Sequence, residues 1–420
     1  MKNLSIHIIL CTFALLFTVS CDSFKDAFDA KEVAPLTVSI NVSLDAEGIS
    51  SVNGLKIKFE NTAEAISETR TLTGNKVDIS DILPGIYNIY VSGKTKNAEG
   101  VEFYLNGTAL TQPLYGDNTE VNILVKGLEL SPLVFKEIYY STSKTDLNKP
   151  YICDQFYELY NNSSETIYLD GIHFADLCPG KASSHPQWPA EDGDKYVYGI
   201  YVWKVPGNGT DYPLAPGESC VLSQYAVNHQ LDIYNPLSPV DCTSVEFEFF
   251  QGTKYPDSPA PNMICVFYNG KSTSTVPQYL TSNSGGAFVI FRVPEGTDYD
   301  PVNNTSLQAK DGTKATLYAR IPTGWIIEAV ECGTDKEAIQ YKRVPSVLDA
   351  GMTYVDGGVG SALGVARKLL TDDDGNIIYN EDGSVLLQDT NNSSEDFERN
   401  VTPTLRRYNA KMPSWNHTLK

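Results

Sequence analysis

The chain has 420 residues and a formal net charge of −20 at pH 7, so it is long enough for two or three domains, each with its own core. Its 25 Tyr, 31 Gly and 23 Pro, with 20% charged residues, are typical of a β-rich extracellular protein. The acidic balance and the lack of a dense Lys/Arg run exclude nucleic acid as the expected partner, because that binding depends on neutralising phosphates.

Residues 1–20 predict a signal peptide. One basic residue, Lys2, precedes an apolar run that ends at Phe17 and is too short to span a bilayer. The run meets Thr18-Val-Ser-Cys21, in which a small residue directly precedes the cysteine, and this pattern resembles the lipobox of bacterial lipoproteins. The resemblance implies that Cys21 is acylated and anchors the protein in the outer membrane; the alternative is an ordinary secretory signal with a chance cysteine.

Residues 21–34 form a polar, acidic tether with no core pattern. Acidic residues soon after the lipidated cysteine resemble the surface-export signal of Bacteroidota lipoproteins, although Phe24 and Lys25 interrupt them. This resemblance implies that the protein faces the cell exterior.

Residues 35–127 predict a small β-sandwich. Apolar and polar residues alternate from Leu36 to Leu44 and again from Leu55 to Phe59, so each strand has one buried face. Leu83-Pro-Gly-Ile-Tyr-Asn-Ile-Tyr-Val91 is a Pro-Gly turn that leads into another alternating strand, and Val121–Val125 is the closing strand. The Pro-Gly phrase resembles a hairpin of prealbumin-like or carboxypeptidase-regulatory-like domains, which implies a spacer without a site.

Residues 128–408 predict the main domain, which opens with a strand at Leu133–Tyr140. In the stretch Asp154–Gly171, Phe156, Glu158 and Tyr160 are expected on one strand face and Tyr157 and Leu159 on the other. A polar turn and a second strand at Ile167–Leu169 then complete a predicted hairpin. Asn161 is expected to cap the turn through its own side chain, and Glu158 to pair with a basic side chain on a neighbouring strand.

This stretch resembles the local pattern of the lamin tail domain, an immunoglobulin-like β-sandwich. Further phrases of that family follow in order: Leu214–Leu222, Leu280–Phe291, Trp325–Cys332, Tyr341–Pro345, Val365–Lys368 and Asp389–Phe397. The resemblance implies an all-β chain of two β-sandwich (immunoglobulin-like) domains, the second an enlarged lamin-tail-like sandwich. Its surplus length falls in insertions at 178–213, 223–279 and 369–388.

As a whole, the chain resembles an uncharacterised family of Bacteroidota outer-membrane lipoproteins that are often encoded beside TonB-dependent transporters. That resemblance implies an outer-membrane transporter or another surface protein as the partner. Within the last insertion, Glu381-Asp-Gly383 predicts the turn of a β-hairpin at 376–388. Residues 409–420 show no pattern and are expected to be a loose tail.

Six of the eight cysteines lie between residues 153 and 332 with no C-x-x-C spacing, which argues against a zinc site. In an oxidising compartment, an even set suggests disulfides, and the alternative is a set of small buried thiols. The candidate disulfide cysteines are Cys153, Cys178, Cys220, Cys242, Cys265 and Cys332. Cys153 and Cys178 bracket the predicted hairpin, which suggests that disulfides tie the insertions to it.

Aromatic residues give the strongest binding signal. Along Tyr196–Trp203, Tyr198 is expected on one strand face, and Tyr201 and Trp203 on the other; Trp188 lies in a Pro-rich loop just before this strand. Aromatic rims stack on sugar rings or apolar ligands, so Trp188, Tyr198, Tyr201 and Trp203 are candidate ligand-binding residues. The alternative is ordinary strand packing, because Tyr and Trp favour strands.

No catalytic pattern stands out. The five histidines are scattered without a metal-binding spacing, and no G-x-S-x-G phrase occurs, so neither a metal nor another cofactor is expected. The sequence therefore favours a non-enzymatic cell-surface lipoprotein that binds a ligand or serves a TonB-dependent nutrient-uptake system. The alternatives are a surface hydrolase with carboxylates in the 178–279 insertions, and an adhesin that binds host matrix.

Overall fold

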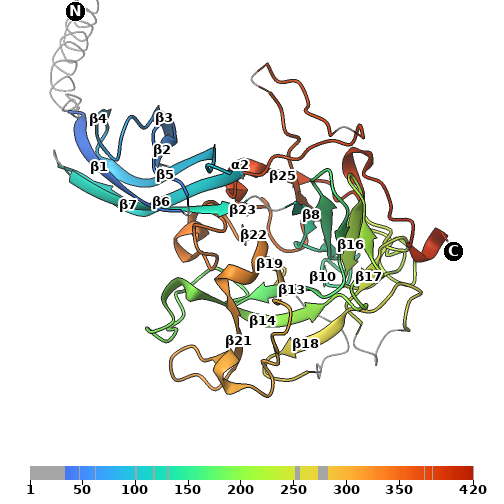
Figure 1. The fold of residues 1–420 in the computed structure, drawn as a ribbon. Coiled ribbons are helices and arrows are strands. Elements are labelled where there is room, and N and C mark those ends of the chain that lie inside the picture. Colours follow the sequence, from blue (N-terminus) through green and yellow to red (C-terminus); the bar gives the residue numbers. More distant parts are fainter. Residues whose placement is uncertain are drawn as a thin grey trace, which may run out of the picture.

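A computed structural model describes residues 34–419, apart from 47, 62, 100–101, 117–118, 130–131, 251–255, 273–281, 373 and 381. The predicted signal peptide, Cys21 and almost all of the acidic tether lie outside the described residues. The rest of the chain forms two β domains that lie side by side, the smaller one built from the N-terminal strands (Figure 1). In the described part, no helix has the length and apolar character needed to cross a membrane.

The N-terminal domain is one curled, seven-stranded sheet with the order β3-β2-β5-β6-β7-β1-β4. Its strands are β1 (Leu36–Asp45), β2 (Lys56–Asn61), β3 (Ile66–Thr71), β4 (Lys76–Ile82), β5 (Gly85–Lys96), β6 (Glu102–Leu114) and β7 (Thr119–Glu129). The sheet curls so that Val38 and Ile40 of β1 pack in the same buried cluster as Ile57 of β2 and Ile89 of β5. Strand β1 therefore has one buried face, as the alternation in its sequence predicts.

The main domain is a sandwich of two sheets. The first sheet has the order β17-β16-β11-β8-β24-β25, and the second β20-β21-β14-β13-β19-β22-β23, with β18 added beside β14. The strands of the first sheet are β8 (Leu133–Tyr139), β11 (Phe156–Asn161), β16 (Ser219–Ser223), β17 (Phe247–Glu248), β24 (Gly364–Arg367) and β25 (Phe397–Val401). Those of the second are β13 (Ile172–Leu177), β14 (Tyr196–Lys204), β18 (Ile264–Tyr268), β19 (Ala287–Arg292), β20 (Gln308–Ala309), β21 (Tyr318–Pro322), β22 (Ile326–Gly333) and β23 (Thr353–Tyr354).

Short elements complete this domain. Two strand pairs lie beside the sheets: β9 (Ser143–Lys144) with β10 (Pro150–Tyr151), and β12 (Ile167–Tyr168) with β15 (Pro213–Leu214). The helical turns are η1 (Gly193–Lys195), η2 (Thr305–Leu307), η3 (Thr323–Trp325), η4 (Lys336–Tyr341), α2 (Ser393–Asp396), η5 (Arg407–Asn409) and η6 (His417–Leu419). The prediction of an all-β sandwich protein is confirmed.

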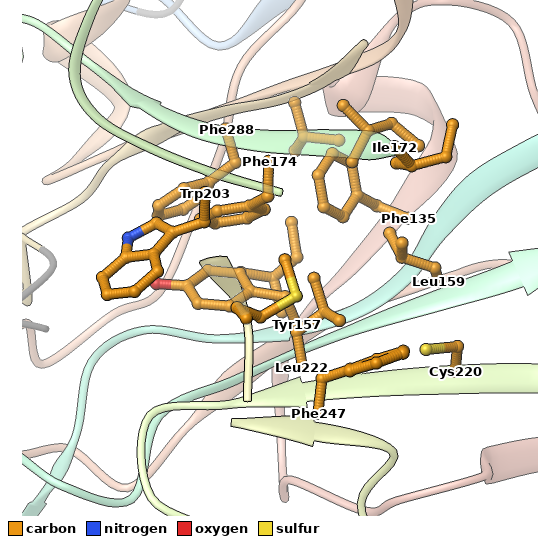
Figure 2. Close-up of a cluster of buried hydrophobic side chains, with 14 of the residues drawn as sticks. Phe135, Tyr157, Leu159, Ile172, Phe174, Trp203, Cys220, Leu222, Phe247 and Phe288 are labelled. Carbon is orange, nitrogen blue, oxygen red and sulfur yellow. The ribbon is translucent and has the colours of Figure 1, made fainter. Parts of the chain in front are cut away.

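The main core lies between the two sheets of this domain (Figure 2). Tyr157 of β11 contacts Phe174 of β13 and Phe288 of β19, with ring centroids 4.7 Å apart in both pairs. Trp203 of β14 is fully buried in the same cluster and packs against Phe249. Aromatic side chains from both sheets thus fill the layer between them, and such pairs add to the stability gained from burial alone.

The stretch Asp154–Gly171 does not form the predicted hairpin. β11 pairs with β8 and β16, whereas β12 pairs with β15, so the chain leaves the first sheet after Asn161. The predicted faces and contacts of β11 are correct: Tyr157 and Leu159 face the main core. The Asn161 carboxamide accepts a hydrogen bond from the Ser163 N–H at 3.0 Å, and Glu158 pairs with Lys136 at 2.9 Å.

The outer face of the first sheet is also buried, because the insertion after β16 and the C-terminal segment cover it. The backbone N–H of Arg406 donates to Glu158, and its guanidinium pairs with Glu246 at 2.6 Å. The prediction of a loose tail at 409–420 is wrong: Trp415 donates to the Pro213 carbonyl at 2.6 Å, and the Asn416 amide bonds to buried Glu246. The sequence hides this because the partners of the tail are polar groups some 170 to 200 residues away.

The hairpin predicted at 376–388 is present. Tyr379 pairs with Val385, and the Leu386 N–H donates to the Ile378 carbonyl, while residue 381 of the turn lies outside the described residues. Gly383 adopts a left-handed φ of 81°, which explains glycine at this position.

None of the six cysteines between residues 153 and 332 forms a disulfide in the structure. Cys220 and Cys332 lie on strands of opposite sheets and pack as small apolar side chains in the main core. Burial raises the pKa of Cys178 to about 11 and that of Cys242 to about 12. The disulfide candidates Cys153, Cys178, Cys220, Cys242, Cys265 and Cys332 are therefore thiols in the structure, all buried except the half-buried Cys265.

The insertion after β16 contains a buried histidine that makes the stability of the protein depend on pH. His229 is fully buried between the Tyr151 hydroxyl and the Tyr225 carbonyl, each 2.9 Å away, and burial lowers its pKa to about 4. In the unfolded chain the same side chain has its ordinary pKa of about 6.5 and therefore binds a proton more readily than in the folded protein. Protonation of His229 thus lowers the free energy of unfolding by up to about 3 kcal/mol as the pH falls from about 6.5 to 4.

Replacing His229 by Gln should therefore cost most stability at pH 7, and its difference from the wild type should shrink by pH 5. Urea unfolding of both proteins at pH 7, 6 and 5 measures this difference. A difference that stays constant across these pH values would contradict a buried, neutral His229.

Candidate binding cleft between the domains

Polar contacts join the described residues of the two domains. Lys58 of β2 pairs with Glu395 of α2 at 2.6 Å, and the Asn106 amide donates to the carbonyls of Thr390 and Asn391. Thr108 bonds to Ser346 through their hydroxyls at 2.6 Å. Contacts of this kind leave space between the domains, as expected of domains that could shift relative to each other.

One cavity at this boundary adjoins a second cavity that is lined by the main domain alone. The larger measures about 360 Å³ and lies between Thr108, Leu124 and Lys126 of the N-terminal sheet and the segment 339–347 of the main domain. The second, about 260 Å³, is lined by Trp188, Tyr196 and Tyr198. Both share Asp194, Lys342, Val344 and Pro345 as lining residues, so they form one continuous cleft, which we call the interdomain cleft.

A pair of stacked aromatic rings forms one wall of the interdomain cleft. Trp188 and Tyr198 lie with ring centroids 3.8 Å apart and planes inclined by 14°. Tyr318 packs against the Trp188 ring edge-on at 5.3 Å. Trp188 remains partly exposed, whereas Tyr198 is buried, so the tryptophan offers an aromatic surface to the cleft.

Hydrogen bonds hold this aromatic pair in place. The Tyr198 hydroxyl donates to Asp192 at 2.9 Å, and Arg320 donates to the same carboxylate oxygen at 2.8 Å. The loop carrying Trp188 is fixed at Gln187, whose N–H donates to Asp311 at 2.8 Å. A surface held this way loses little conformational entropy when a ligand stacks on it.

Two of the four aromatic candidates do not belong to a binding site. Trp203 is buried in the main core, as Figure 2 shows, and Tyr201 packs against that core beside Tyr268 at 4.4 Å. Only Trp188 and Tyr198 line the interdomain cleft. The candidate role of Tyr201 and Trp203 is therefore corrected to strand packing.

The predicted faces of this strand are also wrong. β14 contains a bulge at Ile200: Asp176 pairs with Tyr201, and Leu177 pairs with Gly199. Val197 and Val202, five residues apart, consequently pack in the same cluster. The extra residue places Tyr198 on the same strand face as Tyr201 and Trp203.

The floor of the cleft rests on a buried ion pair. Arg343 is bound to Glu331 at 2.8 Å and donates to the carbonyls of Pro179 and Cys332. Lys342 donates to the carbonyls of Asp349 and Gly351. Both basic side chains are thus bound to groups of the protein itself. Lys126 and Asp194, 3.7 Å apart, form the charged pair of the cleft.

The carboxylates of the 178–279 insertions are largely engaged in structural contacts. Asp192 binds Tyr198 and Arg320, Glu246 binds Arg406, and Glu248 accepts from the backbone N–H groups of Ala226 and Ser258. Among the residues that line the two cavities, Asp194 is the one carboxylate. No three of His, Cys, Asp and Glu approach closely enough to hold a metal ion within the described residues.

Sequence reasoning missed the contribution of the N-terminal domain to the cleft. Leu124 is 48% exposed on β7 and faces the cleft, although it lies in a strand that reads as the closing strand of a spacer. The sequence did contain one signal: Leu124 stands at a position where the alternation of the strand predicts an exposed polar residue.

The molecule is thus an all-β protein of two β domains, with a cleft that begins at their boundary and extends along an aromatic wall of the main domain. The chain belongs to the DUF4876 family: the family model described as "Protein of unknown function (DUF4876)" matches residues 215–404, all in the main domain. The crystal structure of a DUF4876 family protein from Bacteroides thetaiotaomicron VPI-5482 at 2.50 Å resolution is 50% identical in sequence, with a TM-score of 0.69. The match covers 91% of this chain and 100% of that chain.

No curated protein matches the chain. The expectation of an uncharacterised Bacteroidota family is confirmed, whereas the lipid anchor and the likeness to lamin tails stay predictions from the sequence.

Proposed function

We propose that this protein is a lipid-anchored, non-enzymatic surface protein of the outer membrane that binds an oligosaccharide in the interdomain cleft and serves a nutrient transporter. The observation that carries the proposal is the Trp188–Tyr198 stack, held rigid by Asp192 and Arg320 at the wall of the cleft. A flat, partly exposed tryptophan ring offers the stacking surface that sugar rings use.

The other lining groups fit a neutral, hydroxyl-rich ligand. Thr108, Gln340 and Ser346 supply hydroxyl and amide groups, and Leu110 and Leu124 supply apolar contacts. Lys126 and Asp194 carry opposite charges, so the exposed charges of the cleft balance locally. Such a lining favours neutral sugar chains over strongly anionic or cationic ligands.

The number of carboxylates in the lining of the cleft favours sugar binding over sugar hydrolysis. Glycoside hydrolysis by two carboxylates requires a pair about 5 to 9 Å apart across the scissile bond. Among the residues that line the cleft, Asp194 has no second carboxylate beside it. This supports the non-enzymatic proposal over the hydrolase alternative.

Replacing Trp188 by Ala should weaken oligosaccharide binding by about tenfold to a hundredfold, the loss of one stacking contact worth about 1.5 to 3 kcal/mol. Titration calorimetry with maltohexaose, xylohexaose, mannohexaose and chitohexaose measures it. The matched control is Tyr115→Ala, which removes an aromatic ring that is 65% exposed outside the cleft lining and should leave affinity unchanged. Equal affinity of the wild type and Trp188→Ala for every sugar that binds would contradict the assignment.

The anchor has its own test. Changing Cys21 to Ala removes the thiol that acylation requires, so the protein should move from the membrane fraction to the soluble fraction of fractionated cells. Immunoblotting of both fractions measures this redistribution. A Cys21→Ala protein that stays with the membrane as the wild type does would refute the anchor while leaving the cleft proposal standing.

A further inference from the structure

Five large aliphatic side chains are exposed together on two neighbouring loops of the main domain. Leu147 at the tip of the β9–β10 hairpin is 72% exposed, and Ile233 and Leu237 in the insertion after β16 are 78% and 60% exposed. Ile152 and Leu231, on the same two loops, are 36% and 49% exposed. We call these five residues the aliphatic knob. Exposed aliphatic residues grouped in this way mark an interaction surface more often than a solvated one.

Hydrogen bonds join the two loops beneath the knob. The Tyr151 hydroxyl bonds to His229 at 2.9 Å, and the Asn235 amide donates to the Ser143 hydroxyl at 2.8 Å and to the Lys144 carbonyl at 3.1 Å. Asn235 and His229 are buried, so these bonds are shielded from water. The exposed side chains therefore project from a fixed scaffold, which lowers the entropy lost when they are buried against a partner.

An open cavity of about 580 Å³ lies directly beside the knob. It is formed between Gln230 and Pro239–Ser244, the two ends of the loop that carries Ile233 and Leu237, and Thr402–Arg406 of the C-terminal segment. Pro239, Val240, Pro403 and Leu405 give it apolar contact surface. Its volume suffices to accept several aliphatic side chains. The surface thus presents a projection and a depression side by side.

The charges around the knob are balanced, unlike those of the whole chain. Lys144 and Lys149 lie on one of its loops together with Asp146, and Asp232 lies on the other. The chain as a whole carries −20. Two copies of so acidic a protein repel each other, and a locally neutral face with both signs is where they can approach.

We infer that the aliphatic knob is a two-fold interface with a second copy of this chain. In an isologous dimer each copy presents the same patch, so a projection beside a depression lets each knob enter the cavity of the other copy. The same symmetry allows the lysines of one copy to approach the aspartates of its partner. A lipid surface fits less well, because interfacial segments favour aromatic and basic residues, and this knob is aliphatic and neutral.

The test is the mass of the full chain carrying Cys21→Ala, so that no acyl group can drive association, measured by sedimentation equilibrium from 1 to 200 μM. A dimer is expected, and it should persist from 50 mM to 500 mM NaCl because the aliphatic contact does not depend on charge and salt screens the repulsion between acidic chains. Ile233→Asp and Leu237→Asp should each raise the dissociation constant at least about tenfold. Ile86→Asp, at an exposed isoleucine of the N-terminal domain, is the matched control and should leave it unchanged.

A monomer at every concentration and salt would overturn the inference, as would a dimer that survives both Asp variants. Unchanged thermal unfolding of the variants shows that they fold. Sedimentation with phosphatidylethanolamine–phosphatidylglycerol vesicles tests the alternative occupant. If the wild type is a monomer that binds these vesicles, and Ile233→Asp does not bind them, the knob contacts a lipid surface and the dimer inference is wrong.

Discussion

Replacing Arg367 by Met is expected to destabilise the protein by about 3 to 5 kcal/mol, the cost of leaving buried carboxylates without their cation. Arg367 is 1% exposed and binds Glu328 at 2.5 Å, Asp389 at 3.3 Å and Asp396 at 3.4 Å. Its guanidinium also donates to the Phe135 carbonyl at 2.7 Å. One side chain thus connects β8, β22 and the segment 389–396 that contacts the N-terminal domain.

The same variant should recover stability on acidification. Burial raises the pKa of Asp396 to about 6 and that of Glu328 well above its ordinary value, so both carboxyls bind protons more readily in the folded than in the unfolded chain. Stability linked to such groups rises as pH falls through the folded pKa values, and more steeply once Arg367 is gone.

Guanidinium unfolding of wild type and Arg367→Met at pH 7 and pH 5.5 measures both effects. Arg70→Met is the matched control, because Arg70 forms a half-exposed pair with Glu68 and should change stability by less than about 1 kcal/mol. A loss at Arg367 as small as that at Arg70 would contradict the role of the buried cluster.

Replacing Lys136 by Met is expected to cost a similar amount, about 3 to 5 kcal/mol. Lys136 and Glu158 are both fully buried and pair at 2.9 Å on the outer face of the first sheet. Burial lowers the pKa of Lys136, and the charge of Glu158 opposes that shift. Removing the lysine leaves the Glu158 carboxylate with the backbone N–H of Arg406 as its one donor in the described part of the chain.

The double variant Lys136→Met/Glu158→Leu should be more stable than Lys136→Met alone, because two apolar side chains replace the unpaired charge. Urea unfolding of both single variants and the double variant gives the coupling energy. Additive losses in this cycle would show that the two side chains act independently.

The strands could be predicted from the sequence to a large extent. Alternation from Leu36 to Leu44 predicted the correct buried face, and alternation in Phe156–Tyr160 correctly placed Tyr157 and Leu159 toward the main core, because successive side chains of a strand point to opposite faces. Pairing could not be predicted in the same way. β11 bonds to β8 and β16, which lie up to about 60 residues away along the chain, and no local pattern specifies that choice.

The candidate site was predicted in part. Trp188 and Tyr198 line the cleft, whereas one inserted residue at Ile200 changed which side chains share a face with them. The adjoining cavity of the cleft is lined by Thr108, Leu124 and Lys126 of another domain, so that part depends on tertiary contacts.

The basic phrases that carried the family resemblance have a structural explanation. Arg343 in Tyr341–Pro345 and Arg367 in Val365–Lys368 are both buried and bound to glutamates of β22. A buried arginine requires a matching carboxylate, so such residues form a pattern recognisable in sequence without taking part in any reaction.

The central claim is that a ligand occupies the interdomain cleft. Hydrogen–deuterium exchange of the full chain, with and without the hexasaccharide that binds most tightly in calorimetry, tests it most directly. We predict slower exchange in residues 106–110 and 124–126 of the N-terminal domain together with 185–198 and 340–347 of the main domain. Protection confined to one domain, or centred on the aliphatic knob at 229–238, would contradict the account.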